Sequence, residues 1–311
     1  MKKMLKLSCL LLTLSLIFNI TLQAQSLEER LNKFGKKFGE GYVSPFVTAF
    51  GANLNSGLYH SADLETGIDV YVGAKFTVAL IPTSAQEFNA DMSELNALRP
   101  TGTGTYPASV KTATFFGDKG TSVVSSGGLI SDTLQLPDGT NLKAMPLAVP
   151  HIAIGNFFGT RAMLRFFPAT KLENVGEFSF IGFGLQHDVG QWLPAPLPFD
   201  WSAHVMYQSM KVKPLVEASA FSFGTEISKT LAIVTFYGGI AYESASMNFQ
   251  FDWTPPVPLP QTTKKVEFDI SGDNTVRLTA GIALKLFIFH ISADYSIAKQ
   301  PVATLGIGIA I

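Results

Sequence analysis

Apolar residues alternate with small or polar residues along much of this chain. In the stretch TGIDVYVGAKFTVAL (66–80), every second residue from Ile68 to Val78 is apolar, and Asp69 and Lys75 lie on the other face. Side chains along a β-strand point to opposite faces in turn, so this period of two predicts a strand with one apolar face. The pattern recurs in residues 216–228, 274–285, 288–297 and 301–311.

We expect an all-β fold of about twelve antiparallel strands, within a range of 10–14. Turn sequences such as Asp138-Gly139 separate the alternating runs. The stretch QFDWTPPVPLPQTT (250–263) is not a central strand, because its prolines lack the backbone donor that a sheet requires. The predicted strands are residues 43–52, 66–79, 109–116, 145–156, 160–168, 176–189, 200–212, 216–228, 231–250, 264–285, 288–297 and 301–311.

The segment before the strands has helical periodicity. In SLEERLNKFGKKFGE (26–40), Ser26 and Glu29 have the spacing of a capping box. An apolar stripe with helical spacing follows, formed by Leu27, Leu31, Phe34 and Phe38. We therefore expect an amphipathic helix within residues 25–41, which either plugs the barrel or is a loose helix in the periplasm.

The first 24 residues have the features of a secretory signal peptide. Lys2, Lys3 and Lys6 form a basic start, an apolar stretch runs from Leu10 to Ile20, and Ala24 offers a cleavage point. The single cysteine of the chain, Cys9, lies inside this segment. We therefore predict cleavage after Ala24, and a mature chain without a disulfide or a thiol nucleophile.

The strands suit a transmembrane antiparallel β-barrel, residues 42–311, better than a soluble secreted β-domain. Only 15% of the residues are charged, against roughly 25% in soluble domains. Single charges, such as Lys75 and Glu226, occur mid-strand on the non-apolar face. In a membrane barrel the apolar face meets lipid, and closure of the ring satisfies every backbone group. The alternating terminal strand, 301–311, would close the barrel on the first strand. These features predict the outer membrane as the location.

The three tryptophans, Trp192, Trp201 and Trp253, lie at predicted strand ends beside proline-rich turns. Tryptophan is enriched at membrane interfaces, so we expect these residues to form an interface girdle. Ordinary core positions are the alternative.

The sequence carries no motif of a catalytic, metal or cofactor site. It has no G-x-S-x-G or H-E-x-x-H, and no Lys/Arg run indicates nucleic acid as a partner. We therefore expect a protein that is not an enzyme and has no metal or cofactor. An outer-membrane hydrolase, which needs a Ser–His pair inside the barrel, is the least favoured alternative.

Several positions predicted to face the lumen form a candidate substrate path. Phe178, Phe180, Met206 and Met210 are apolar, and methionine suits an adaptable apolar site. The polar members of this set are His204, Glu226, Arg277, Lys285 and Asp294.

Three stretches resemble an uncharacterised family of outer-membrane barrel proteins of Bacteroidota-like bacteria, which carries a domain-of-unknown-function label. They are FGLQHDVGQWLPAPLPFDWSAHVMYQSMKV (183–212), YGGIAYESASM (237–247) and residues 274–311. A more distant likeness is to the long-chain fatty-acid transporter class, which has an N-terminal segment inside its barrel. The resemblance implies a barrel in the outer membrane, but no activity and no functional residues.

Two functions remain open. The first is a passive channel for small hydrophobic molecules, and the second is a sealed structural or partner-binding barrel. The partners expected are outer-membrane lipid, the barrel assembly machinery and, for the channel, a small hydrophobic substrate. Outer-membrane barrels usually end in an aromatic residue, whereas this chain ends in Ile311.

Overall fold

The computed structural model of the chain describes residues 34–64, 69–172, 176–213, 216–254 and 262–310. The predicted signal peptide (residues 1–24), Leu27, Leu31 and Ile311 lie outside these residues. No helix in the described part is long and apolar enough to cross a membrane.

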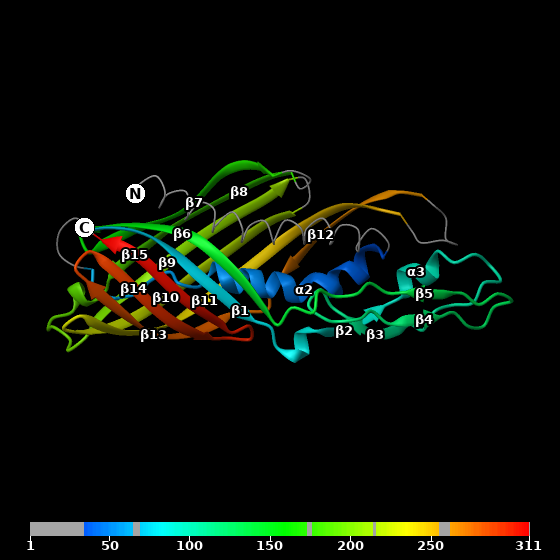
Figure 1. Cartoon of the computed structure of the whole chain (residues 1–311), viewed down its shortest axis with the longest axis horizontal. Helices are drawn as coiled ribbons and strands as arrows, with labels where there is room; N and C mark the ends of the chain where they lie inside the picture. The colour runs from blue at the N-terminus through cyan, green and yellow to red at the C-terminus, as the bar shows by residue number, and fades with distance from the viewer. Residues whose placement is uncertain (1–33, 65–68, 173–175, 214–215, 255–261, 311) are drawn as a thin grey trace.

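Ten antiparallel strands close into a barrel, which confirms the predicted fold class (Figure 1). The ring runs β1–β6–β7–β8–β9–β10–β11–β13–β14–β15 and returns to β1. The strands are β1 Asp69–Leu80, β6 Ala144–Phe157, β7 Thr160–Leu172, β8 Gly176–Asp188, β9 Asp200–Lys213, β10 Val216–Leu231, β11 Val234–Trp253, β13 Val276–Leu286, β14 Phe289–Ile297 and β15 Val302–Ala310.

The terminal strand closes the ring, as the alternating C-terminus predicted. β15 pairs with β1 from Val302↔Ala79 to Ala310↔Tyr71, and its other edge pairs with β14. Strand β12, Lys264–Ser271, continues β13 along the same edge of β11, so the two together form the single strand predicted for 264–285. An apolar strand with an unpaired edge would be prone to aggregate in water, but β15 is paired on both sides.

The two faces of the barrel wall differ in chemistry. Apolar residues that are roughly half exposed cover the outside, and charged residues of the same strands are buried inside. On β10, for example, Phe223 and Ile227 are exposed and Glu226 is 1% exposed. The outer set includes Val72, Phe166, Phe183, Leu185, Phe236, Ile240, Leu278, Ile282, Ile291, Leu305 and Ile307.

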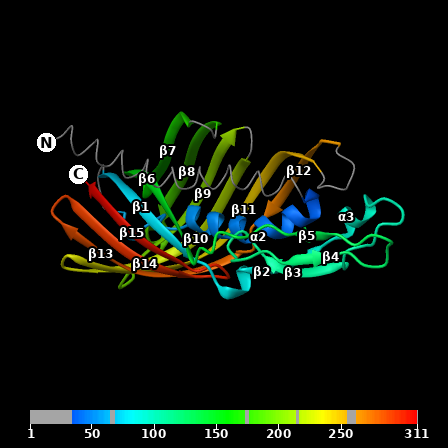
Figure 2. The same cartoon turned by 45° about the vertical axis from the view of Figure 1, so that its right-hand side comes forward.

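The two ends of the barrel also differ. At one end, called here the turn end, two-residue turns join β6 to β7, β10 to β11 and β13 to β14. At the other, the loop end, residues 81–143 join β1 to β6 and project away from the barrel (Figures 1 and 2). We call residues 81–143 the extension.

The extension contains two small sheets, and it corrects one predicted strand. It comprises η1 Thr83–Ala85, β2 Glu87–Asp91, α3 Ser93–Ala97, β3 Ser109–Ala113, β4 Ser122–Val124 and β5 Thr133–Gln135. β2 pairs with β3 and β4 pairs with β5. The prediction of a barrel strand at 109–116 is therefore wrong, because β3 pairs within the extension.

Helix α2, Gly35–Leu54, enters the barrel from the loop end: its N-terminal turns pack against the extension and its C-terminal part lies inside the ring (Figure 1). Residues 25–33 of the predicted helix lie outside the described residues. Helix α2 continues through residues 43–52, so the strand expected there is wrong. Without 43–52 and 109–116, the remaining ten predicted strands correspond to the ring.

Two physical features explain the helix. Its residues are buried on almost every side, so it lacks the polar face that reveals a surface helix. Small residues let it approach the wall, since a Cβ on Gly51 would lie 2.2 Å from the Cβ of Ala245 on β11.

Candidate functional site

The chain passes through the whole barrel before its first strand begins. At the N-terminus of α2, the backbone N–H of Lys37 donates to Glu94 Oε2 of the extension (2.9 Å). After Leu54, residues 55–64 continue toward the turn end, where Asn156 Nδ2 donates to the carbonyl oxygen of Leu64 (2.8 Å). We call residues 35–64 the lumen segment.

Arg165 of β7 holds the C-terminal end of the helix. Its side chain is fully buried, and Nη1 donates to the carbonyl oxygen of Leu54 (2.7 Å). Nη2 donates to the carbonyl oxygens of Ser56 (2.8 Å) and Gly57 (2.9 Å). The last carbonyls of a helix lack intrahelical donors and carry partial negative charge, so a buried cation is favourable here.

Arg277 of β13 clamps the same region from the opposite wall. It donates to the carbonyl oxygen of Ala52 (2.9 Å) and to Ser56 Oγ (2.7 Å), and its Nε donates to Glu243 Oε2 of β11 (2.8 Å). The buried charge is therefore compensated by a buried carboxylate, as such charges require. Two strands on different sides of the ring thus fix one turn of the lumen segment.

A second polar network lies nearer the turn end, around Glu226 of β10. Its carboxylate accepts hydrogen bonds from Ser202 Oγ (2.7 Å) and Gln186 Nε2 (2.9 Å), and it lies 2.7 Å from His204 Nδ1. Gln186 Nε2 also donates to the carbonyl oxygen of Ser61 (2.8 Å). This network ties the lumen segment to β8, β9 and β10.

The same network contains a Ser–His–Glu arrangement. His204 Nε2 lies 3.2 Å from Ser222 Oγ, while its Nδ1 faces Glu226 Oε2. This order of nucleophile, base and orienting carboxylate is that of serine hydrolases. All three side chains are at least 97% buried, and the ring of Tyr59 packs 5.3 Å from that of His204. The adjoining cavity measures about 10 Å³, which is room for a single water molecule at most.

The lumen segment and inward-facing side chains occupy the part of the barrel interior that the structure describes. Toward the loop end, an apolar cluster surrounds α2 and includes Phe38, Phe50, Phe180, Met210 and Phe249. At the turn end, a polar cavity of about 80 Å³ is lined by residues including His60, Asp69, Arg161, Lys285 and His290. A cavity of this size holds a few water molecules.

The structure places most residues of the candidate path inside the barrel but not on one surface. Phe180 and Met210 pack in the cluster around α2, with Phe178 half-buried beside it. Met206 lies in a separate cluster with Tyr59 and Tyr237. Three polar members, His204, Glu226 and Arg277, belong to the two networks described above. Asp294 is buried, accepts a hydrogen bond from Tyr237 (3.0 Å) and lines the small cavity beside His204. Lys285 is exposed at the turn-end cavity.

The two residues of the predicted plug helix that are described, Phe34 and Phe38, are both buried. The three tryptophans do not form one girdle. Trp192 is 74% exposed and Trp201 is half-buried on the outer wall. Trp253 is 7% exposed and packs inside against Gly35, so the girdle position predicted for it is wrong.

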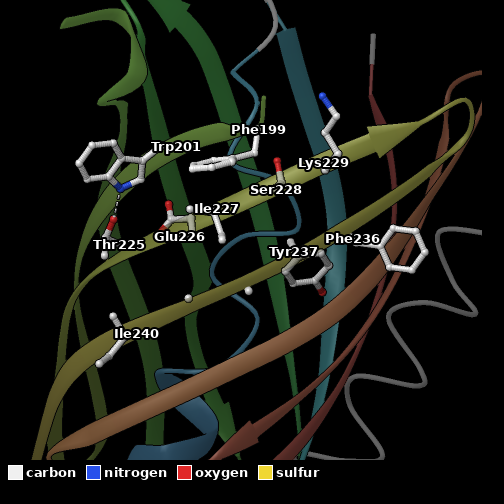
Figure 3. A pocket seen from close by; sticks show the side chains of 12 residues that line it. Phe199, Trp201, Thr225, Glu226, Ile227, Ser228, Lys229, Phe236, Tyr237 and Ile240 are labelled. Atoms are coloured by element: carbon white, nitrogen blue, oxygen red, sulfur yellow. Dashed lines mark hydrogen bonds between the residues drawn. The ribbon is translucent and has the colours of Figure 1, made fainter. Parts of the chain in front are cut away.

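A groove of about 500 Å³ lies on the outer wall near the turn end, where β9, β10 and β11 adjoin (Figure 3). Gly238 of β11 pairs with Ile227 of β10, and a Cβ there would contact only the carbonyl oxygen of Thr279. The missing side chain leaves a hollow between Trp201, Ile227, Phe236 and Ile240. Trp201 Nε1 donates to Thr225 Oγ1 (2.6 Å), which fixes the indole at its rim (Figure 3).

The sequence offered a signal for this groove that our predictions did not use. A glycine inside a strand often marks the close approach of another molecule, and Gly238-Gly239 interrupts the pattern of β11.

These features define a class of protein: a closed antiparallel β-barrel filled by its own N-terminal segment. The chain belongs to the family of unknown function DUF6588, whose profile matches residues 1–311. This finding confirms the resemblance to an uncharacterised barrel family. Comparison with curated proteins gives no match.

Several solved barrel structures are similar at low identity. Ail, the attachment invasion locus protein of Yersinia pestis, is 12% identical, with 78% of this chain and 97% of that chain covered and a TM-score of 0.20. The translocator domain of autotransporter NalP from Neisseria meningitidis is 11% identical (85% and 92% covered, TM-score 0.25). The toluene transporter TodX of P. putida is 10% identical (91% and 73% covered, TM-score 0.27). At these values the likeness carries no information about function.

Proposed function

We propose that this chain is an integral outer-membrane barrel whose lumen is closed by its own N-terminal segment. The membrane location is supported by the distribution of apolar and charged residues. The wall is apolar outside and carries buried charges inside, which is the reverse of a soluble β-sandwich and the arrangement that lipid requires.

The observation that carries the closed state is the attachment of the lumen segment. Arg165 and Arg277 reach it from opposite walls and bond its backbone at Ala52, Leu54, Ser56 and Gly57. Moving the segment would remove three backbone acceptors from the buried Arg165 and would leave the buried carbonyls of Ser56 and Gly57 without these donors, which is costly. The barrel therefore serves as a structural scaffold, and the extension at its loop end is the part available to a partner.

Passive uptake of small hydrophobic molecules is the second candidate. It is favoured by the apolar surroundings of α2, since Phe38 and Phe50 of the helix belong to one apolar cluster with Phe180 and Met210 of the wall. A hydrophobic solute could take the place of the helix side chains there without meeting a charge, but the clamp at Leu54 would have to open.

Reconstitution into planar bilayers and liposomes separates the two candidates. A membrane barrel should require detergent for extraction and should migrate differently on gels before and after boiling. A closed barrel should give no conductance steps and no liposome swelling, and hydrophobic tracers should enter liposomes at the rate of protein-free controls. Stepwise conductance or faster tracer entry would contradict closure, and recovery without detergent would contradict the membrane location.

A further inference from the structure

The groove over Gly238 has the properties of a site for one lipid chain. Its walls are aromatic and aliphatic side chains, and its volume of about 500 Å³ lies within the usual range of ligand sites. It opens on the apolar outer face of the wall, since Phe199, Ile227, Phe236 and Ile240 are each 37–52% exposed.

One cation lies at the end of this apolar groove. Lys229 of β10 points outward and faces Phe236 across the strand pair, two positions closer to the turn end than Ile227. Among the described residues, no carboxylate pairs with it. Asp200, on the neighbouring strand, accepts a hydrogen bond from Ser228 Oγ (3.3 Å), on the lumen side of the wall.

The order of these residues along the wall matches the order of groups in a phospholipid. A lysine near the membrane surface attracts anionic head groups, and aromatic rings with aliphatic side chains accept hydrocarbon. Going from the turn end toward the middle of the wall, the groove presents Lys229 level with Phe236, then Ile227 level with the hollow at Gly238, then Ile240.

We propose that this groove binds an anionic phospholipid of the leaflet at the turn end, with its phosphate on Lys229 and one acyl chain over Gly238. This inference rests on the proposed membrane location, but not on whether the lumen is closed. The ligand class is a phosphatidylglycerol-like lipid, which differs from a zwitterionic lipid at the head group alone.

Trp201 reports occupancy directly, because it lines the groove. The experiment uses the full mature chain with the substitution Trp192→Phe, since Trp192 is exposed and Trp253 is buried inside the barrel, out of reach of lipid. The protein is titrated in mixed micelles with phosphatidylglycerol or phosphatidylcholine brominated on the acyl chains, and quenching of tryptophan fluorescence is followed.

Phosphatidylglycerol should quench at about fivefold lower mole fraction than phosphatidylcholine. This factor corresponds to about 1 kcal/mol for one lysine near an anionic membrane surface, at tenfold per 1.4 kcal/mol. Lys229→Gln should abolish the preference, whereas Lys264→Gln, an exposed lysine at the loop end, should keep it.

Filling the groove provides an independent arm. Gly238→Leu should reduce quenching by both lipids, and Ala293→Leu, which places the same side chain elsewhere on the outer wall, should not. Gel migration before and after boiling shows whether each variant is folded, and the need for detergent during extraction tests the membrane location separately.

Equal quenching by the two head groups in the Trp192→Phe protein would overturn the proposal, as would an unchanged preference in Lys229→Gln. If Gly238→Leu instead converts an oligomer to a monomer without altering the lipid preference, the groove is an interface between copies and the lipid assignment is wrong.

Discussion

Arg165 Nη1 donates a hydrogen bond of 2.7 Å to the carbonyl oxygen of Leu54, so a strand of the barrel wall holds the last residue of the helix inside it. The two residues are 111 positions apart in sequence. The bond joins the barrel and its contents into one unit, and it makes the stability of the wall depend on the segment that fills it.

Replacing Arg165 tests this dependence. Arg165→Met should lower the free energy of unfolding by about 2 kcal/mol or more, because the buried carbonyls of Ser56 and Gly57 lose these donors at about 1–3 kcal/mol each. The carbonyl of Leu54 keeps a second donor, Gln208 Nε2 (2.7 Å). Urea titration in detergent, followed by the loss of the heat-modifiable gel band, measures the change. Lys213→Met, at an exposed ion pair, should shift unfolding by less than about 0.5 kcal/mol. Equal urea midpoints for the two variants would show that the clamp contributes nothing.

The position of α2 against β11 predicts a compensating pair. Gly51→Ala should destabilise the fold by about 1–3 kcal/mol, since the new Cβ would overlap that of Ala245. Ala245→Gly combined with Gly51→Ala moves the methyl group to the other element and should restore most of the loss. The double-mutant cycle should give a coupling of at least about 0.5 kcal/mol. Purely additive effects would place the helix away from β11.

The burial of Ser222 leads to a chemical prediction. Its geometry with His204 and Glu226 would suit a nucleophile, but the cavity beside it is about 10 Å³. A fluorophosphonate probe should therefore not label the folded barrel, in native membranes or in mild detergent, and the Ser222→Ala variant should give the same blank result. Labelling that disappears in Ser222→Ala would show that the lumen opens and that the barrel is a hydrolase.

The strands could be predicted from sequence because the side chains of each strand point alternately to the apolar outside and to the polar inside of the barrel. Leu305 and Ile307 face outward at 43% and 47% exposure, with Gly306 between them against Ser292 and Lys75. A period of two follows directly from such a two-sided environment, and all ten strands of the ring carry it in some form.

The lumen segment could not be predicted in the same way. Tyr42, Val43, Val47 and Phe50 are all buried, because the barrel wall and the extension together surround the helix. A helix without a polar face does not alternate between apolar and polar residues with a period of 3.6, so the sequence gives no helical signal. Its aromatic and β-branched residues are those that strands favour. The clamp was equally hidden, since Arg165 bonds backbone carbonyls and not a carboxylate that could be recognised along the chain.

A charged cluster of Arg99, Tyr106 and Asp132 stabilises the extension, and its carboxylate makes the stability of the extension depend on pH. Asp132 pairs with Arg99, whose side chain is 2% exposed, and also accepts a hydrogen bond from Tyr106. The hydrogen bond from the Arg99 guanidinium holds the pKa of Asp132 well below its usual range. A carboxylate whose pKa is lower in the folded state than in the unfolded state stabilises the fold at pH values above its unfolded-state pKa of about 3.9. This stabilisation is lost as the pH falls from there toward the folded-state pKa.

The extension should therefore resist pepsin equally at pH 5 and pH 4.5 and become progressively more susceptible below about pH 4. Asp132→Asn should make it susceptible across this whole range, with a local loss of about 3 kcal/mol from breaking a largely buried pair. Glu87→Gln, which removes an exposed pair with Lys111 in the same extension, should be cleaved like the unaltered chain. The uncleaved barrel band serves as the internal reference on each gel. Equal cleavage of Asp132→Asn and the unaltered chain at pH 5 would show that this cluster does not hold the extension together.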